Sequence, residues 1–206
     1  MIKIWGRANS NNVKKVLWCA EEAAIPYQRK DAGGAFGLLD TSEFNDLNPN
    51  RRVPVLEDGT LIVWESNAIV RYLSAQYAPE TLYLPNPGPR ALADRWMDWS
   101  SISFGPVFVT IFWNLMRVPK EQQDVAAVSR AVEQAGRTLA VADAALRQAP
   151  YLSGAAFGMG DIPLGCLMHA WFNLSISRPE LPSVTQWYER LLTRAAYQKI
   201  VAVPLS

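Results

Sequence analysis

Two polar side chains stand where a short apolar segment meets the start of a helical pattern, in Trp64-Glu65-Ser66-Asn67. Ser66 falls near the first turn of that helix, where unpaired backbone N–H groups and the positive end of the helix dipole favour a carboxylate or phosphate. Glu65 adds a carboxylate beside this anion site. The pair suits a zwitterion with ammonium and carboxylate groups on one carbon, the head of an α-amino acid. The simpler alternative is that Ser66 only caps its own helix.

A second polar segment, Arg7 to Lys15, joins the first expected strand to the first expected helix. Ser10 or Asn12 is placed to cap that helix, which is again the simpler interpretation. A hydroxyl or amide at a helix N-terminus can also donate a hydrogen bond to a nearby thiolate. Donor and helix dipole would both stabilise the charged form and lower the thiol pKa from its usual value of about 8.5.

A third junction, Val53-Pro54, follows Arg51-Arg52 and opens another expected strand, where proline is tolerated only at an edge or a first position. X-Pro bonds in folded proteins are cis in about 5–6% of cases. If this bond were cis, the turn would present the N–H and C=O of Val53 outward and offer a docking edge for a peptide. Arg51 and Arg52 are most simply solvated charges, but beside such an edge they can hold a second carboxylate.

Short strand patterns alternate with helical ones in the first eighty residues. Asp58-Gly59 predicts an antiparallel hairpin, because Gly adopts positive φ without steric cost. The order β-α-β, loop, β-β-α predicts a small mixed sheet covered by helices. The expected strands are 1–5, 27–31, 53–57 and 61–64; the first helix is marked by Val13, Val16, Leu17 and Ala20, and the second spans 65–77.

The rest of the chain shows helical patterns only. Prolines at 79, 85, 87 and 89 cannot continue a helix and predict a linker at 80–90 between domains at 1–79 and 91–206. A long amphipathic helix is expected over 125–146, as a bundle helix or, alternatively, a coiled-coil seam. Its apolar residues at steps of three and four are Val125, Val128, Val132, Ala135, Leu139, Ala142 and Leu146.

Composition and charge exclude several classes of protein. With 50% hydrophobic and 19% charged residues among 206, the chain is not disordered, and a net charge of +1 gives no global field for nucleic acid or an anionic membrane. No apolar run reaches the roughly 18–20 residues of a membrane span, and the start lacks a secretory pattern, so the cytoplasm is expected. Cys19, Cys166 and His169 are too few for a disulfide framework or a zinc site, so no metal is expected.

These motifs together resemble the cytosolic glutathione S-transferases over essentially the whole chain. The resemblance rests on the Ser-containing loop, on N-P-N-R-R-V-P-V-L-E-D-G paired with W-E-S-N-A-I-V-R-Y-L, and on the proline-rich linker and helical half that follow. No Tyr precedes Tyr27, so the chain is most similar to the serine-type, theta-like and bacterial branch. The resemblance implies an α+β thioredoxin-like N-terminal domain that binds glutathione, an all-α C-terminal domain that helps hold an electrophile, and a homodimer.

The resemblance also implies roles for individual residues along the bound tripeptide. Val53, before the cis proline of the family, would pair its backbone with the cysteinyl unit. Glu65 and Ser66 would bind the γ-glutamyl head. Arg52 takes the place of a Lys or similar polar residue near the glycyl end.

Ser10 would be the donor to the thiolate, because it precedes Lys14 by four residues as in the Ser-x-x-x-Arg pattern of the family. Asn12 is the reserve candidate, since the serine branch often has Pro there and this chain does not. Asp161 matches the buried helix-capping Asp of the family. The usual Ser or Thr partner of that Asp is replaced by Gly158, which predicts an incomplete capping box and a slightly less stable helix.

Apolar walls are expected for the second substrate. Phe104, Phe108, Phe112 and Trp113 fall roughly one turn apart, and such a stripe is more often core than ligand wall. Within it, Phe108 and Phe112 are the expected pocket residues. Trp5, at the end of the first strand, is expected to line the same space.

The expected function is therefore a transferase of alkyl or aryl groups, in which glutathione is the co-substrate and its thiolate attacks a small apolar electrophile. One alternative is glutathione-dependent disulfide or peroxide reduction, in which glutathione supplies every sulfur because no cysteine lies near Ser10 in the sequence. Another is a non-catalytic binding module with the same fold. The sequence does not identify the electrophile.

Overall fold

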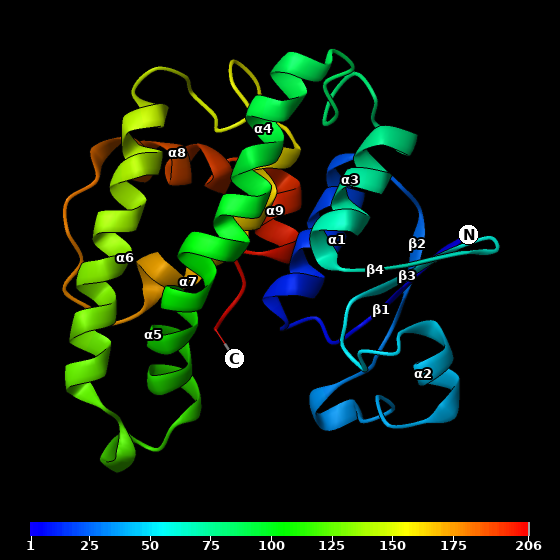
Figure 1. The fold of residues 1–206 in the computed structure, drawn as a ribbon, viewed down its shortest axis with the longest axis horizontal. Helices are drawn as coiled ribbons and strands as arrows, with labels where there is room; N and C mark the ends of the chain where they lie inside the picture. Colours follow the sequence, from blue (N-terminus) through cyan, green and yellow to red (C-terminus); the bar gives the residue numbers. More distant parts are fainter. Residues whose placement is uncertain (206) are drawn as a thin grey trace.

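The computed structural model describes residues 1–205, in which a part built on a four-stranded sheet packs against a helical part (Figure 1). The strand order is β2-β1-β3-β4, with β1 parallel to β2 and antiparallel to β3, and β4 antiparallel to β3. This confirms the predicted mixed sheet and its hairpin. The strands are β1 (Ile2–Trp5), β2 (Tyr27–Lys30), β3 (Val55–Asp58) and β4 (Leu61–Trp64).

Helices cover both faces of this sheet. α1 (Asn11–Glu22) and α3 (Ser66–Tyr77) lie between the sheet and the helical part, whereas α2 (Ser42–Leu47) lies on the outer face (Figure 1). Ile4 is fully buried toward α1 and α3, and Phe44 of α2 packs against Val55 on the other side. The sequence pattern does not predict α2. Its start is fixed by Thr41, whose hydroxyl accepts a hydrogen bond from the Phe44 N–H at 3.2 Å.

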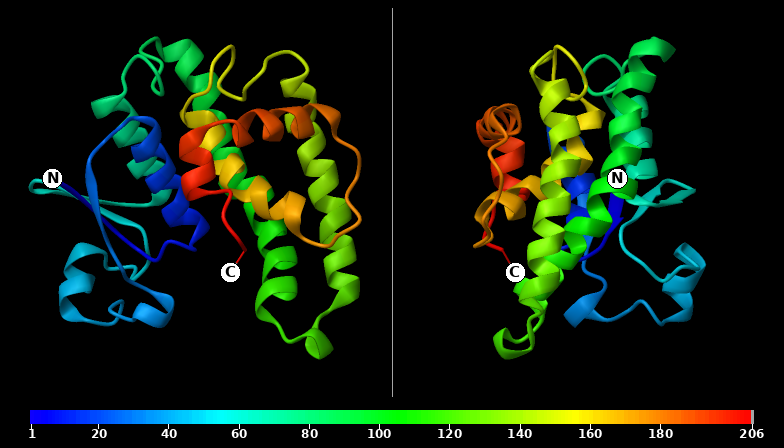
Figure 2. Two further views of the ribbon diagram at one scale, coloured as in Figure 1. Left: turned by 180° about the vertical axis from the view of Figure 1, so that it is seen from behind. Right: turned by 60° about the vertical axis from the view of Figure 1, so that its left-hand side comes forward.

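The second part of the described chain consists of helices, with α7 at its centre (Figure 2). The predicted long helix is α6, and its apolar positions are buried except Val125, which is 75% exposed at the first turn. Among the described residues, every helix is too short or too polar to span a lipid bilayer. The elements are α4 (Pro87–Trp99), a π-helical turn (Ser100–Phe104), α5 (Gly105–Arg117), α6 (Val125–Leu146), α7 (Ile162–Asn173), α8 (Pro182–Leu192) and α9 (Ala195–Ile200).

α4 begins inside the proline-rich segment, which corrects the expectation that these prolines keep 80–90 free of helix. Pro87 and Pro89 occupy the first turn of α4, where backbone N–H groups have no helical acceptor and a fixed φ is favourable. Asn86 caps the helix by accepting a hydrogen bond from the Gly88 N–H at 3.1 Å. The irregular connection between α3 and α4 is therefore shorter than the sequence indicates.

The two parts are held together mainly through α1, which packs against α7 and α9. Trp18 is fully buried and packs edge-on against Tyr197 of α9, with ring centroids 4.8 Å apart. Glu22 at the end of α1 forms an ion pair with Arg194 at 2.7 Å. Because α1 is anchored to the helical part, its N-terminus at Ser10 has a fixed position relative to that part.

Candidate active site

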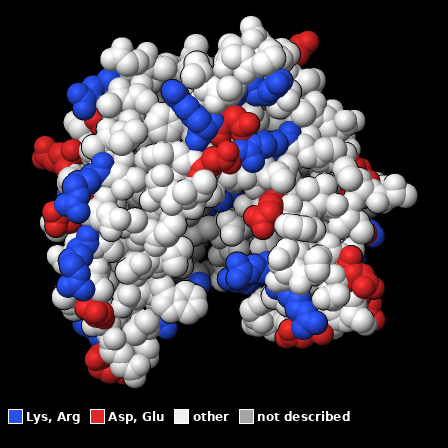
Figure 3. Space-filling view, viewed as in Figure 1, with Lys and Arg blue, Asp and Glu red and all other residues white. Residues whose placement is uncertain are grey.

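A cavity of about 830 Å³ opens between the two parts, with α1 and α3 on one side and α5 and the π-helical turn on the other. Figure 3 shows the corresponding hollow in the surface, with side chains of both charges near it. Predicted site residues from both halves of the chain line this cavity: Asn12, Glu65, Ser66, Phe108 and Phe112. The cavity thus joins the predicted amino-acid site to the predicted apolar wall.

Glu65 and Ser66 form the start of α3 at one wall of the cavity. Glu65 has φ +72°, a conformation that costs a non-glycine residue energy and is concentrated at functional sites. Ser66 is 7% exposed and follows the N-cap position, so the alternative that it caps its own helix is wrong. Its hydroxyl donates to the Asn12 side-chain oxygen at 3.4 Å. The free N–H groups of α3 and the Glu65 carboxylate are therefore available together.

Ser10 occupies the N-cap position of α1, yet its side chain makes no capping hydrogen bond. Its backbone is satisfied, since the N–H donates to the Arg7 carbonyl at 3.2 Å and the carbonyl accepts from the Lys14 N–H at 2.9 Å. The hydroxyl is half-buried and does not line the cavity described above. Capping therefore does not explain Ser10, and its hydroxyl has no protein partner within residues 1–205.

Val53 lies beside the loop that carries Ser10. A methyl group added to Gly6 in that loop would lie only 3.2 Å from the Val53 Cβ, and Gly6 itself has φ +149°. The Val53-Pro54 bond is cis. Within the described chain, no backbone hydrogen bond engages the N–H or C=O of Val53. Arg52 is exposed, and its carbonyl accepts from the Asn48 side chain at 2.8 Å, which fixes the segment.

Trp5 does not line the cavity, which corrects the expectation that it forms part of the apolar wall. Its ring packs edge-on against Phe44, with centroids 6.3 Å apart, and its N–H donates to Glu57. The reason is the alternation of side chains along a strand. Ile4 faces the core under α1, so its neighbour Trp5 faces α2.

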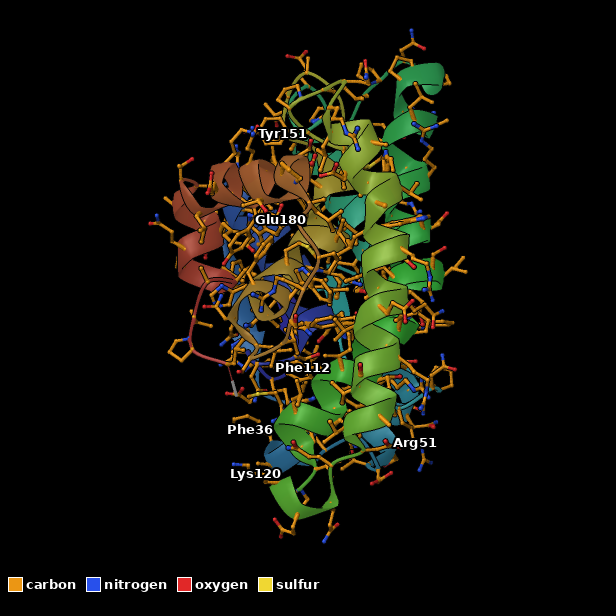
Figure 4. All side chains as sticks on the ribbon, turned by 90° about the vertical axis from the view of Figure 1, so that its left-hand side faces the viewer. Phe36, Arg51, Phe112, Lys120, Tyr151 and Glu180 are labelled. Carbon is orange, nitrogen blue, oxygen red and sulfur yellow. The ribbon has the colours of Figure 1, made fainter. Side chains whose placement is uncertain are left out.

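Phe108 and Phe112 supply the aromatic wall on α5. Phe108 is 1% exposed, and its ring lies 5.9 Å from that of Phe112. Phe112 is partly exposed in the lower half of α5 (Figure 4). Phe104 is part of the core, whereas Trp113 is 59% exposed at the cavity rim. Of the predicted aromatic stripe, Phe104 therefore belongs to the core, whereas the later residues line the cavity.

The polar floor of the cavity was missed by the sequence analysis. Lys15 lines it although it is only 5% exposed, and burial lowers the pKa of its ammonium group. Asn67 donates to the Met97 carbonyl at 2.8 Å, but its side-chain oxygen is buried without a partner among residues 1–205. The hydroxyl of Ser100 is likewise buried without a hydrogen-bond partner among residues 1–205. Lys15 follows the candidate Asn12 by three residues, and residues three apart on a helix are neighbours on its surface, so this spacing could have identified Lys15.

Asp161 lies at the start of α7, the helix that contributes Leu167 to the cavity lining. It is fully buried, and its carboxylate accepts hydrogen bonds from the N–H groups of Leu152, Ser153 and Gly158 and from the Trp187 indole at 2.8–3.2 Å. Burial raises the pKa of Asp161, while these donors favour its charged form. Ser153 also accepts from the Gly160 N–H at 3.1 Å. A hydroxyl from Ser153 thus takes the place of the one missing at Gly158, and the slightly lower stability expected for this helix stays a prediction.

Comparison with known proteins agrees with this architecture. Residues 1–75 match the model of the glutathione S-transferase N-terminal domain, and residues 104–195 match that of the C-terminal domain. The chain therefore belongs to the glutathione S-transferase family, whose members are enzymes with glutathione as co-substrate. This confirms the resemblance, the fold class and the transferase activity expected from the sequence.

Similar proteins cover the full length of the chain. A theta class glutathione S-transferase from the citrus canker pathogen Xanthomonas axonopodis pv. citri, crystallised with glutathione bound, is 56% identical with a TM-score of 0.96 over 100% of this chain and 99% of its own. Glutathione S-transferase GstB of Escherichia coli strain K12 is 40% identical over 100% of both chains. Maize glutathione S-transferase I in complex with an atrazine glutathione conjugate is 25% identical. Its TM-score is 0.88, and the match covers 98% of this chain and 96% of the maize chain.

Proposed function

We propose that this glutathione S-transferase grips glutathione along three junctions, at Ser10, at Val53 and at Glu65-Ser66, and holds its sulfur as the thiolate. The thiolate attacks a small, mostly apolar electrophile in the cavity. The observation that carries the proposal is the cavity itself, in which Glu65 and Ser66 face the same space as Phe108. One substrate can therefore be fixed at its polar head while the other contacts the aromatic wall.

The γ-glutamyl head fits the start of α3. Its carboxylate would accept hydrogen bonds from the Ser66 hydroxyl and the first free N–H groups of the helix, where the dipole is positive. Its ammonium would pair with the Glu65 carboxylate. Extended peptide would then follow the unpaired backbone of Val53, with its glycyl carboxylate toward the exposed Arg52.

The reacting sulfur would lie near the N-terminus of α1. The Ser10 hydroxyl is unused by the helix, so it is free to donate to the thiolate. In the reaction, sulfur forms a bond to the electrophilic carbon, and the leaving group departs with its electron pair. No covalent bond to the protein is needed, since the protein contributes proximity and charge stabilisation.

Glutathione must supply the reactive sulfur because neither cysteine is available. Cys19 and Cys166 are both buried, and burial raises the pKa of each thiol to about 12. Both are free thiols, which supports the further proposal that the protein acts in the cytoplasm. Conjugation is therefore favoured over a disulfide exchange that uses a protein thiol.

Turnover measurements test this function. With glutathione present, we expect conjugation of a chloronitroarene, followed by absorbance, to exceed reduction of a small disulfide in kcat/KM. A heat-denatured sample gives the uncatalysed background. Faster turnover of the disulfide would contradict the proposal in favour of reduction. Absence of turnover on a panel of electrophiles, together with no retention on immobilised glutathione, would favour a binding module.

We further propose a homodimer, because the edge strand β4 carries apolar side chains to solvent. Leu61, Ile62 and Trp64 are 41%, 43% and 39% exposed, and an exposed apolar edge is a typical site of association. Gel filtration is expected to give a mass near twice 23.0 kDa. The variant Ile62→Glu should lower the gel-filtration mass toward that of a single chain. A single-chain mass for the unaltered protein would exclude the dimer.

A further inference from the structure

Lys15 lines the cavity, and its Nζ is not among the fully enclosed polar atoms of the described residues, so the ammonium group is open to the cavity. The residue is 5% exposed, yet within residues 1–205 no hydrogen bond or ion pair engages its Nζ. The neighbouring Lys14 is equally buried, at 6%, but donates to the Val201 carbonyl at 3.4 Å and does not line the cavity. These two adjacent lysines of α1 thus differ, since only Lys15 lines the cavity.

The acidic groups around the cavity do not neutralise Lys15. Asp98 lines the cavity but is engaged by Arg71 at 2.6 Å, and Arg71 also binds Asp94 at 2.5 Å. Glu65 is close enough to favour the charged form of Lys15, but it is beyond ion-pair distance. Because Glu65 is proposed to hold the glutathione ammonium, it is not free to serve Lys15 when glutathione is bound. An ammonium on a largely buried side chain without an anionic partner is unfavourable, so an anionic ligand in the cavity would stabilise it.

Ser100, which also lines the cavity, carries a donor without a partner. The Ser100 hydroxyl is buried in the π-helical turn without a hydrogen-bond partner among the described residues, although buried polar groups are normally paired. Around these two donors the lining is largely apolar, with Phe108 and Phe112 of α5 and Leu167 of α7. Such a cavity complements an apolar body that bears one anionic acceptor.

We propose that Lys15 is a specificity-determining residue that makes this transferase select electrophiles bearing a carboxylate, with Ser100 as a second donor. The inference rests on the proposed function, since it assigns a substrate class to the same cavity. Glutathione also carries carboxylates, but the one on its γ-glutamyl head already has partners at Ser66. The preference must therefore appear when only the electrophile changes.

A matched pair of electrophiles tests this selectivity: para-chloro-meta-nitrobenzoate and its methyl ester, which differ in charge at one position. For Lys15→Met relative to the unaltered protein, kcat/KM for the acid should fall about 10- to 100-fold, the range of a hydrogen bond to a charged group. For the ester it should change far less. Lys15→Arg should retain most of the preference, and Lys14→Met should leave the ratio of the two substrates unchanged. An equal fall for acid and ester would overturn the proposal and assign Lys15 to glutathione or to folding.

A binding measurement separates this inference from the proposed function. Calorimetric titration of meta-nitrobenzoate and its methyl ester into glutathione-saturated protein requires no turnover. We expect the acid to bind more tightly, and Ser100→Ala to weaken the acid alone, even if Lys15→Met does not fold. Equal affinity for acid and ester in the unaltered protein would overturn the inference. Absence of conjugation with both electrophiles would instead count against the proposed function.

Discussion

Replacement of Ser10 by alanine is expected to lower kcat/KM about 10- to 1,000-fold, the range for loss of one donor to a developing or resident anion. The hydroxyl takes no part in capping α1, so its removal should leave the fold intact and act on the thiolate alone. The affinity for glutathione should change little, because the peptide is held elsewhere. The thiolate absorbance of the complex, titrated against pH, should show the apparent thiol pKa rising toward about 8.5.

Asn12→Ala is the matched comparison for this experiment. Asn12 lies at the same helix terminus and lines the cavity, and in the protein without glutathione its side-chain oxygen accepts from Ser66 at 3.4 Å, so its side chain is directed toward α3. We expect a smaller effect on the thiol pKa than for Ser10→Ala. An unchanged titration in Ser10→Ala, with the shift found in Asn12→Ala instead, would transfer the role to Asn12.

Replacement of Asp161 by alanine is expected to reduce the free energy of unfolding by about 3–5 kcal/mol, because several buried N–H donors lose their acceptor at once. Urea denaturation followed by circular dichroism measures this change. Asp124→Ala is the control, since Asp124 caps α6 at an exposed position, through a single bond of 2.8 Å to the Ala127 N–H. It should cost about 1 kcal/mol. Equal losses in the two variants would show that Asp161 is an ordinary cap.

The sequence was most informative where local rules determine structure. Asp58-Gly59 predicts the hairpin of β3 and β4, and the apolar spacing of α6 predicts its buried face, because turn chemistry and side-chain period are local properties. Local rules do not predict that Glu65 and Phe108 line one cavity, because no local pattern specifies how α3 and α5 meet. That prediction came from the resemblance to a family.

The errors have physical causes that lie outside local pattern. Trp5 was assigned to the wrong face because its aromatic character was given more weight than the alternation set by Ile4. Lys15 was assigned to the polar segment that precedes the first helix, because a lysine is expected in solvent. The structure instead places it on α1, which packs against α7, with 5% of the residue exposed. Ser153 replaces the missing capping hydroxyl from a separate loop, which sequence spacing cannot show.

The crystal structure of the protein with glutathione tests the central claim most directly. We expect the sulfur within about 3.2 Å of the Ser10 hydroxyl, the cysteinyl backbone paired with Val53, and the γ-glutamyl head between Glu65 and the start of α3. A tripeptide bound elsewhere, or a sulfur whose nearest donor belongs to a different side chain, would contradict the account.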